Sequence, residues 1–270
     1  MKEYTEIRFE KGTAGNELLL ASLYEAGFEG FEEEDESLKA FMPSEEYDGE
    51  QLKEIAERFE VSFTKNTIQP SNWNLAWETG FEPVTVGKFA AIRAGFHEPV
   101  KNVEHEVIIT PKMSFGTGHH ATTYLMIEGM QALQLQGKRV MDFGTGTGIL
   151  AILAEKCGAA NVLAIDNDEW SIENATENAS NNGCKAITLR MAEIPESNYQ
   201  FDVILANINK NIIIENLAAL SKALTRDGSL LLSGLLEDDR DDIIAACARV
   251  ELNPLEIKVR NKWLFLRVTY

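Results

Sequence analysis

The chain has 270 residues, of which 44% are hydrophobic and 9% aromatic, so it can bury a substantial core and is not expected to be disordered. Its formal net charge of −18 argues against nucleic-acid binding, because a phosphate backbone is held by Lys and Arg side chains. No apolar run approaches the roughly 18 residues of a membrane-spanning helix, and the charged start MKEYTEIRFEK is unlike a secretory signal. The three scattered cysteines form no CxxC pair, so we expect a cytoplasmic protein without disulfides and without a metal site.

Residues 1–70 predict a small α+β domain. The expected order is strand, helix, strand, strand, helix, strand, over 4–10, 14–26, 28–34, 37–43, 48–59 and 61–68. This order is typical of a ferredoxin-like domain. The segment holds eighteen acidic and seven basic residues, a local net charge of −11. Two interpretations follow: a solvated face that aids solubility, or a docking surface for a basic protein.

Residues 71–105 are rich in proline and aromatic side chains, including Trp73, Trp77 and Phe89. They are too apolar for a flexible linker, so we interpret them as a connector with some structure of its own.

From residue 106 onward strands and helices alternate. Strands are expected over 105–110, 138–143, 161–166, 186–190, 201–207, 228–234, 255–260 and 263–270, with helices over 122–133, 148–158, 169–183, 211–224 and 238–250. Such alternation predicts an α/β fold with a doubly wound parallel sheet. Only the turn RNK separates the last two strands, so they should be antiparallel neighbours.

The motif MDFGTGTGIL, at 141–150, follows a buried strand and opens a helix, which is where α/β sheets place ligand loops. Gly144, Gly146 and Gly148 let the backbone turn sharply and approach a ligand. The dinucleotide pattern GxGxxG would need glycine at 149, where this chain has Ile149, and no GK[ST] of a P-loop follows.

Asp166 ends the next strand, where a carboxylate can accept hydrogen bonds from both ribose hydroxyls of a nucleoside. The arrangement resembles the class I S-adenosylmethionine-dependent methyltransferases, which have a seven-stranded sheet with an antiparallel last strand. The resemblance implies S-adenosylmethionine as cofactor, with Gly144 and its neighbours beside it. It also implies that Asp142 pairs with the cofactor's amino group and that Asp166 binds the ribose.

Asn207 ends the strand FDVILAN. In enzymes of this class a residue at that place faces the reacting methyl group, and an amide oxygen there can orient a substrate amine. The alternative is that Asn207 caps the following helix, although Asn209 competes for that role.

The segment SFGTGHHATT, at 114–123, contains the same tetrapeptide FGTG, but no ordinary nucleotide motif has this form. Thr122 and Thr123 suit a helix N-terminus. The segment resembles the FGTG-x-H-x-TT signature of the bacterial ribosomal protein methyltransferase family PrmA, and the resemblance extends over essentially the whole chain. It implies cofactor contacts from Thr123, Gly144, Asp166 and Asn207, and we add Phe115 and Gly116.

The family resemblance implies methylation of amino groups on large-subunit ribosomal protein eleven, at the base of the stalk. A basic protein of this kind would dock on the acidic N-terminal domain, and Asn207 is the catalytic candidate. The alternatives are a methyltransferase acting on another protein or on a small molecule, and a catalytically silent cofactor-binding protein. We expect a monomer.

Overall fold

The chain forms two compact units, Met1–Ala76 and Trp77–Tyr270, which are described separately. The computed structural model describes residues 4–10, 19, 22–23, 26–28, 30–33, 37–59, 61–68, 82–110, 120–194 and 199–270.

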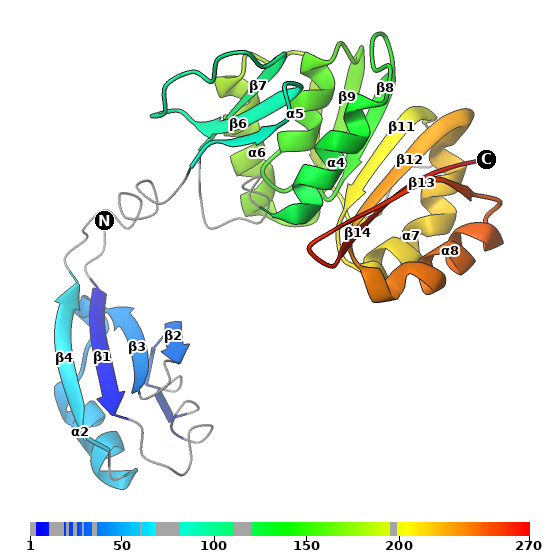
Figure 1. The fold of residues 1–270 in the computed structure, drawn as a ribbon. Helices are drawn as coiled ribbons and strands as arrows, with labels where there is room; N and C mark the ends of the chain where they lie inside the picture. Colours follow the sequence, from blue (N-terminus) through cyan, green and yellow to red (C-terminus); the bar gives the residue numbers. More distant parts are fainter. Residues whose placement is uncertain are drawn as a thin grey trace. The chain divides into compact units, whose positions relative to one another are not determined.

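The first unit contains a four-stranded antiparallel sheet (Figure 1). Its elements are β1 (Tyr4–Glu10), β2 (Gly30–Glu33), β3 (Ser37–Pro43), the helix α2 (Gly49–Arg58) and β4 (Phe63–Ile68). The strand order is β2-β3-β1-β4. Each strand predicted for this unit is present, to within two residues at either end.

Alternate residues of β1 and β3 form the core of this unit, because successive side chains of a strand point to opposite faces. Ile7 and Phe9 of β1 pack with Leu38, Ala40 and Met42 of β3. The carboxylate of Asp48 caps α2 by accepting from two backbone N–H groups of its first turn. Most of the helix predicted over 14–26 lies outside the described residues, although Leu19, Ser22 and Leu23 are helical.

The second unit is built on a seven-stranded mixed sheet with the order β10-β9-β8-β11-β12-β14-β13 (Figure 1). The strands are β8 (Arg139–Phe143), β9 (Asn161–Asp166), β10 (Ile187–Met191), β11 (Phe201–Asn207), β12 (Leu224–Leu236), β13 (Asn253–Arg260) and β14 (Trp263–Thr269). Adjacent strands from β10 to β12 run parallel. The predicted seven-stranded α/β sheet is therefore confirmed.

The last strand is antiparallel to both of its neighbours, β12 and β13, between which it lies. Asn261 and Lys262 connect β13 to β14, and both have positive φ angles, 50° and 66°. Positive φ at both central residues is the geometry of a type I′ turn, whose twist matches that of the flanking strands. The expected antiparallel pairing of the last two strands is confirmed.

Helices cover both faces of this sheet. They are α4 (Ala121–Gln131), α5 (Ile149–Lys156), α6 (Glu169–Asn181), α7 (Lys210–Ala223) and α8 (Arg240–Arg249). Along β8, Val140 belongs to the core shared with α4 and α5, whereas Met141 and Phe143 belong to the core shared with α7 and α8. This alternation explains why the strands are apolar throughout, since both of their faces are buried.

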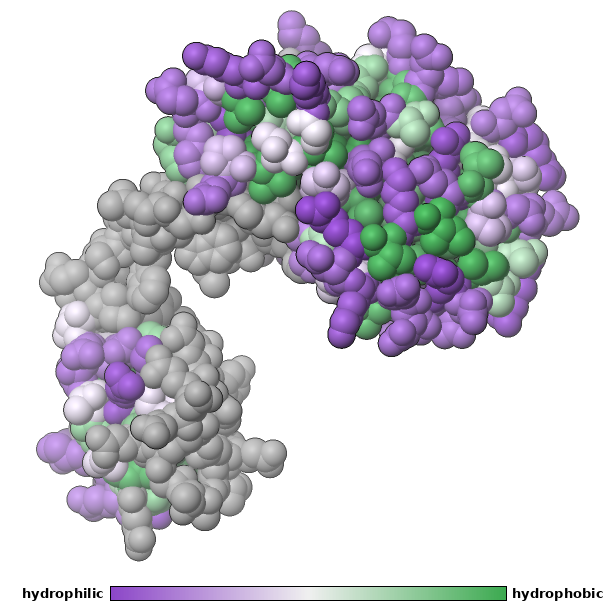
Figure 2. Space-filling model, viewed as in Figure 1, coloured by the Kyte–Doolittle hydropathy of each residue, from purple (hydrophilic) through white to green (hydrophobic). Residues whose placement is uncertain are grey.

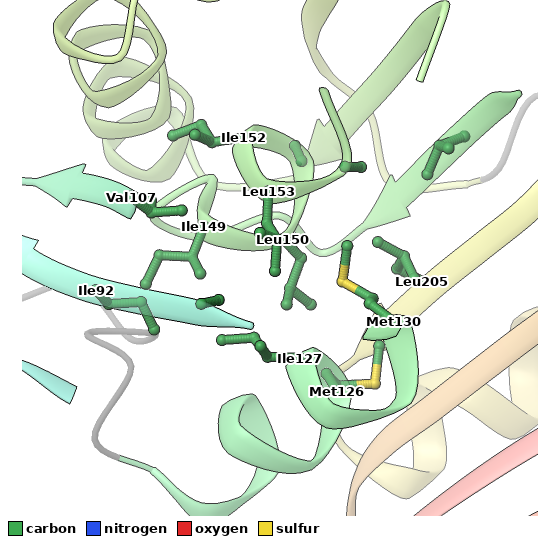
Figure 3. Packing of buried hydrophobic residues seen from close by; sticks show 14 of the residues in the cluster. Ile92, Val107, Met126, Ile127, Met130, Ile149, Leu150, Ile152, Leu153 and Leu205 are labelled. Carbon is green, nitrogen blue, oxygen red and sulfur yellow. The ribbon is translucent and has the colours of Figure 1, made fainter. Parts of the chain in front are cut away.

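A second, three-stranded sheet packs on the side of the seven-stranded sheet that α4 and α5 cover. Its strands are β5 (Val84–Val86), β6 (Ala90–Ala94) and β7 (His105–Ile109), and β6 runs parallel to β7. Arg93 of β6 is buried and donates from Nη2 to Glu106 Oε2 of β7 at 2.9 Å, and this hydrogen bond lowers the pKa of Glu106. Figure 3 shows Ile92 and Val107 packed toward α5 and α4.

This sheet changes the division of the chain that the sequence predicts. Residues 84–94 belong with the second unit instead of forming a separate connector over 71–105. The strand predicted over 105–110 is present as β7, but it joins this small sheet and not the seven-stranded one. The reason is tertiary, because apolar residues of β6 and β7 belong to one core with α4 and α5 of the second unit.

The surface in Figure 2 is largely hydrophilic over the described part of the second unit, with hydrophobic areas between. One exposed apolar row lies on the edge strand β13, at Leu255, Ile257 and Val259. Within the described ranges, no helix is both long and apolar enough to cross a membrane.

Candidate functional site

A cavity of about 460 Å³ lies at the carboxyl edge of the parallel strands. The sheet register brings the ends of four strands together: Met191 pairs with Asp166, and Phe143 pairs with both Ile165 and Ala206. The residues that follow these positions therefore share one edge of the sheet, which is where α/β folds bind ligands.

The glycine loop between β8 and α5 forms one wall of the cavity. Gly144, Gly146 and Gly148 have φ angles of 75°, 53° and 80°, a region that side-chain-bearing residues rarely adopt. A Cβ on Gly144 would lie 2.3 Å from Ile208 Cγ2, and a Cβ on Gly148 would lie 3.1 Å from Ala175 Cβ. The glycines are needed both for the turn and for the close approach of neighbouring residues.

Asp166 lies at the cavity, as its position after β9 predicts. Its Oδ2 accepts from the backbone N–H of Gly146 at 2.8 Å, and its Oδ1 accepts from that of Asp168 at 3.1 Å. A carboxylate has about four lone-pair sites, so each oxygen keeps capacity for a ligand hydroxyl. Asp166 thus holds the glycine loop and lines the cavity at once.

Asp142 has a different position from the one expected for a cofactor contact. It lies behind the glycine loop, is buried, and does not line the cavity. Its Oδ2 accepts from Thr145 Oγ1 at 2.7 Å and from the backbone N–H of Ala151 at 3.2 Å. Ala151 lies in the first turn of α5, whose N-cap is Gly148 and has no side chain to offer. Asp142 therefore caps this helix from the neighbouring strand.

Burial strongly affects the charge of Asp142. It raises the pKa of this carboxyl to about 7, although the hydrogen bonds from Thr145 and Ala151 oppose the shift and the charge of Asp166 adds to it. The other oxygen, Oδ1, has no hydrogen-bond partner among the described residues. An unpartnered buried oxygen disfavours the ionised form.

Asn207 lies at the end of β11 and lines the cavity. Its Nδ2 donates to Thr123 Oγ1 at 3.4 Å, and its buried Oδ1 has no partner within the described ranges. The alternative role, capping α7, belongs to Asn209, whose Oδ1 accepts from the backbone N–H of Ile212 at 3.1 Å. Asn207 is therefore free to present an acceptor to the cavity.

The helix predicted after SFGTGHHATT begins at Ala121, and His120 is its N-cap. Thr122 and Thr123 are buried in its first turn, as their sequence position predicts, and both line the cavity. Phe115 and Gly116, which were also expected at the cofactor, lie outside the described residues.

Trp263 lines the cavity but no sequence pattern pointed to it. Its ring packs against that of His120 at a centroid distance of 4.5 Å and an angle of 70°, and burial lowers the pKa of His120. Because β14 is antiparallel, its first residue lies at the edge where the parallel strands end. The predicted antiparallel pairing of the last two strands did not by itself place Trp263 at this edge.

Ala192 and Glu193 are further lining residues that the motifs missed. They directly follow β10, so the general rule that ligands bind beyond the carboxyl ends of parallel strands would have found them.

A seven-stranded sheet with an antiparallel last strand, together with a cavity bounded by a glycine loop, defines a methyltransferase-like α/β fold. The profile of the family described as "Ribosomal protein L11 methyltransferase (PrmA)" matches residues 6–270. The chain belongs to this family.

Individual relatives give the same family assignment. A ribosomal protein L11 methyltransferase of Porphyromonas gingivalis is 40% identical over 262 residues, which cover 94% of this chain and 90% of the relative. One of Chlorobaculum parvum is 35% identical and covers 97% and 94%. A crystal structure of a ribosomal protein L11 methylase from Lactobacillus delbrueckii subsp. bulgaricus has a TM-score of 0.66 at 30% identity, and the match covers 70% of this chain and 98% of that one.

Proposed function

We propose that this protein transfers methyl groups from S-adenosylmethionine to amino groups of ribosomal protein L11, on lysine side chains, the N-terminal α-amine or both. The observation that carries the proposal is the unpartnered, buried Oδ1 of Asn207 in the wall of the cavity. The names of the relatives support the choice of substrate.

The cavity fits the proposed cofactor. Gly144 and Gly146 bring backbone without side chains to the wall of the cavity, and Asp166 offers carboxylate oxygens suited to ribose hydroxyls. We assign cofactor contacts to Thr123, Gly144 and Gly146 together with Asp166 and Asn207. Phe115 and Gly116 stay sequence-based proposals, and we assign Asp142 and Gly148 to the support of the loop. When bound, S-adenosylmethionine supplies a methyl group on a positively charged sulfur.

The chain's part in the reaction is to hold and align the acceptor amine. A lysine amine has a pKa near ~10.4 and an α-amine near ~8, so the amine must lose a proton before it can act as a nucleophile. A partly desolvated cavity favours the neutral amine. Asn207 Oδ1 then accepts an amine N–H, which directs the nitrogen lone pair. The hydrogen bond from the amide nitrogen to Thr123 holds the amide group, so we assign the unpartnered oxygen as the acceptor for the amine.

The function is tested by incubating unmethylated ribosomal protein L11 with this protein and S-adenosylmethionine, followed by mass spectrometry. We expect mass increases of one or more methyl groups on lysine or N-terminal residues. Methyl incorporation only into another protein or a small molecule would support the alternative substrates. Binding of S-adenosylmethionine without any transfer would contradict the proposed activity.

For the first unit, we propose a ferredoxin-like domain that docks the basic substrate. Two observations support this: the antiparallel order β2-β3-β1-β4 with a helix between β3 and β4, and the net charge of −11 over residues 1–70. Opposite charge favours encounter with a basic partner. We further propose that the protein acts as a monomer in the cytoplasm, where its substrate is made and where its three free cysteines stay reduced.

A further inference from the structure

The free edge of β7 is covered by side chains of α6. Asn182 accepts from the backbone N–H of Ile108 at 2.9 Å and donates to the carbonyl oxygen of the same residue at 2.6 Å. Asn178 accepts from the backbone N–H of Thr110 at 2.7 Å. Ile108 and Thr110 are about 6.6 Å apart along a strand, and Asn178 and Asn182 are about 6 Å apart along a helix, so the two periods match.

The two asparagines differ in what their second amide group does. Both amide atoms of Asn182 bond to Ile108 of β7, and its Nδ2 also bonds to the carbonyl oxygen of Asn178 in its own helix. Asn178 donates instead from Nδ2 to the carbonyl oxygen of Thr147, at 2.9 Å. Thr147 belongs to the glycine loop and lines the cavity. Asn178 therefore joins that loop to the residue from which the chain enters segment 111–119, where the other FGTG lies.

Asn178 is fully buried, and three hydrogen bonds determine which way its amide lies: Oδ1 accepts from the Thr110 N–H, and Nδ2 donates to the Thr147 carbonyl and, at 3.3 Å, to Asn174 Oδ1. The Thr110 N–H requires an oxygen, and the Thr147 carbonyl requires a donor, so the amide has one satisfactory orientation. The neighbouring face of α6 also touches the loop, because a Cβ on Gly148 would meet Ala175. The loop thus rests on α6 through both packing and a buried hydrogen bond.

We propose that Asn178 is a positioning residue for the cofactor: it holds the Thr147 carbonyl, and with it the glycine loop, in the conformation that binds S-adenosylmethionine. The inference rests on the proposed function, since it assigns the cavity to that cofactor. Asn182 makes an equivalent clamp on β7 without reaching the loop and so provides a matched control.

The test compares Asn178→Asp with Asn182→Asp in the full chain, using calorimetric titration with S-adenosylhomocysteine. Each substitution places a carboxylate against two oxygen acceptors: the Thr147 carbonyl and Asn174 Oδ1 for Asn178→Asp, and the carbonyls of Ile108 and Asn178 for Asn182→Asp. We expect Asn178→Asp to raise the Kd by about tenfold or more and Asn182→Asp to change it by less than about twofold. Both substitutions should lower the Tm. Equal loss in both variants, or unchanged binding by Asn178→Asp, would overturn the proposal.

Acidification gives a second readout. A protonated carboxyl can donate to the Thr147 carbonyl and accept from Thr110, so the affinity of the Asn178→Asp protein should recover toward wild type between pH 8 and pH 5.5. Asp142 and Asp166 beside the loop and Glu177 beside Thr110 are present in both proteins, so the ratio of the two Kd values is compared. A ratio that stays constant with pH would contradict the assigned bond.

Two further outcomes separate the possible failures. If the Asn178→Asp protein does not fold, Asn178→Ala removes all three side-chain hydrogen bonds without adding a charge and is expected to show the same selective loss of affinity. Failure of the wild-type chain to bind S-adenosylhomocysteine would refute the proposed function. Binding by the wild type that is indifferent to residue 178 would refute only the role of Asn178.

Discussion

Asn207 and Thr123 are 84 residues apart in the chain, yet Asn207 Nδ2 donates to Thr123 Oγ1 at 3.4 Å. This contact joins the end of β11 to the first turn of α4 and so connects the motif SFGTGHHATT to the strand beside the glycine loop. Because the amide nitrogen is engaged, the amide oxygen is the atom left without a partner among the described residues. The first prediction tests this contact. The others concern Asp166, Asp142, Gly129 and the first unit of the chain.

Replacing Asn207 by Ala removes the acceptor that orients the amine. We expect methyl transfer to fall by roughly a hundredfold, the effect of a misaligned nucleophile. Thr123→Val removes only the hydroxyl that holds the amide and should lower the rate of methyl transfer about tenfold. Thr123→Ser keeps the hydroxyl and should lower the rate less. Single-turnover rates with saturating cofactor measure these effects. Full turnover by Asn207→Ala with normal cofactor binding would show that the orienting role is wrong.

Asp166→Asn removes one of the two oxygens that accept from Gly146 and Asp168 and that face the cavity. We expect the Kd for S-adenosylhomocysteine to rise by about tenfold to a hundredfold, because a hydrogen bond with a charged acceptor is worth roughly 1.5–3 kcal/mol. Calorimetric titration measures the change. Asp168→Asn, which alters the cap of α6 outside the cavity lining, is the control and should leave the Kd nearly unchanged.

Asp142 should make stability depend on pH. Its folded pKa, about 7, lies above its ordinary value of 3.8, so the folded state binds the proton more tightly than the unfolded state does. Its contribution is therefore fully present below about pH 4 and is lost as the pH rises to about 7. The free energy of unfolding of Asp142→Asn relative to wild type should increase over this range and then level off. Urea unfolding at pH 4, 5.5 and 8 checks this, and a pH-independent difference would contradict it.

Gly129 lies in α4 where the helix crosses β14. A Cβ there would lie 2.3 Å from Cζ of Phe265, whose ring is fully buried. Ala is better than Gly in a helix by about 1 kcal/mol, but such overpacking costs typically 1–3 kcal/mol. We expect Gly129→Ala to lower the free energy of unfolding by about 1–2 kcal/mol. Combining it with Phe265→Leu should give less than the sum of the two losses, and strict additivity would refute the clash.

The docking role of the first unit is tested by deletion at the boundary between the units. A chain of residues 77–270 retains β5 and β6, whereas a cut at 105 would remove both strands and leave β7 without its partner β6. We expect it to bind S-adenosylhomocysteine like the full chain but to methylate ribosomal protein L11 with a strongly raised KM. Unchanged kcat/KM toward that protein would eliminate the docking proposal.

The features that were predictable are those that depend on near neighbours in the chain. Apolar strands buried on both faces, the turn RNK between two strands, and three glycines at alternate positions each have a local physical cause. The choice between Asn207 and Asn209 as helix cap was also visible, because Asn209 stands directly before α7 and Asn207 ends the strand.

Other features depend on which segments meet. A cofactor contact was expected at Asp142. Its carboxylate instead accepts from the first turn of α5, and this depends on how that helix packs on the sheet. Trp263 reaches the cavity because β14 is antiparallel and begins at the edge where the other strands end. Residues 84–94 belong to the second unit because β6 finds its partner in β7.

The sequence by itself determined the class of fold, the glycine loop, Asp166 and Asn207, since each follows from a pattern within one strand and its next turn. Only the tertiary structure decided that Asp142 supports the loop, that Thr123 contacts Asn207 and that Asn178 joins the glycine loop to Thr110 at the end of β7. The physical reason is that these are hydrogen bonds between distant segments, and a buried polar group bonds to whichever partner the packing brings to it.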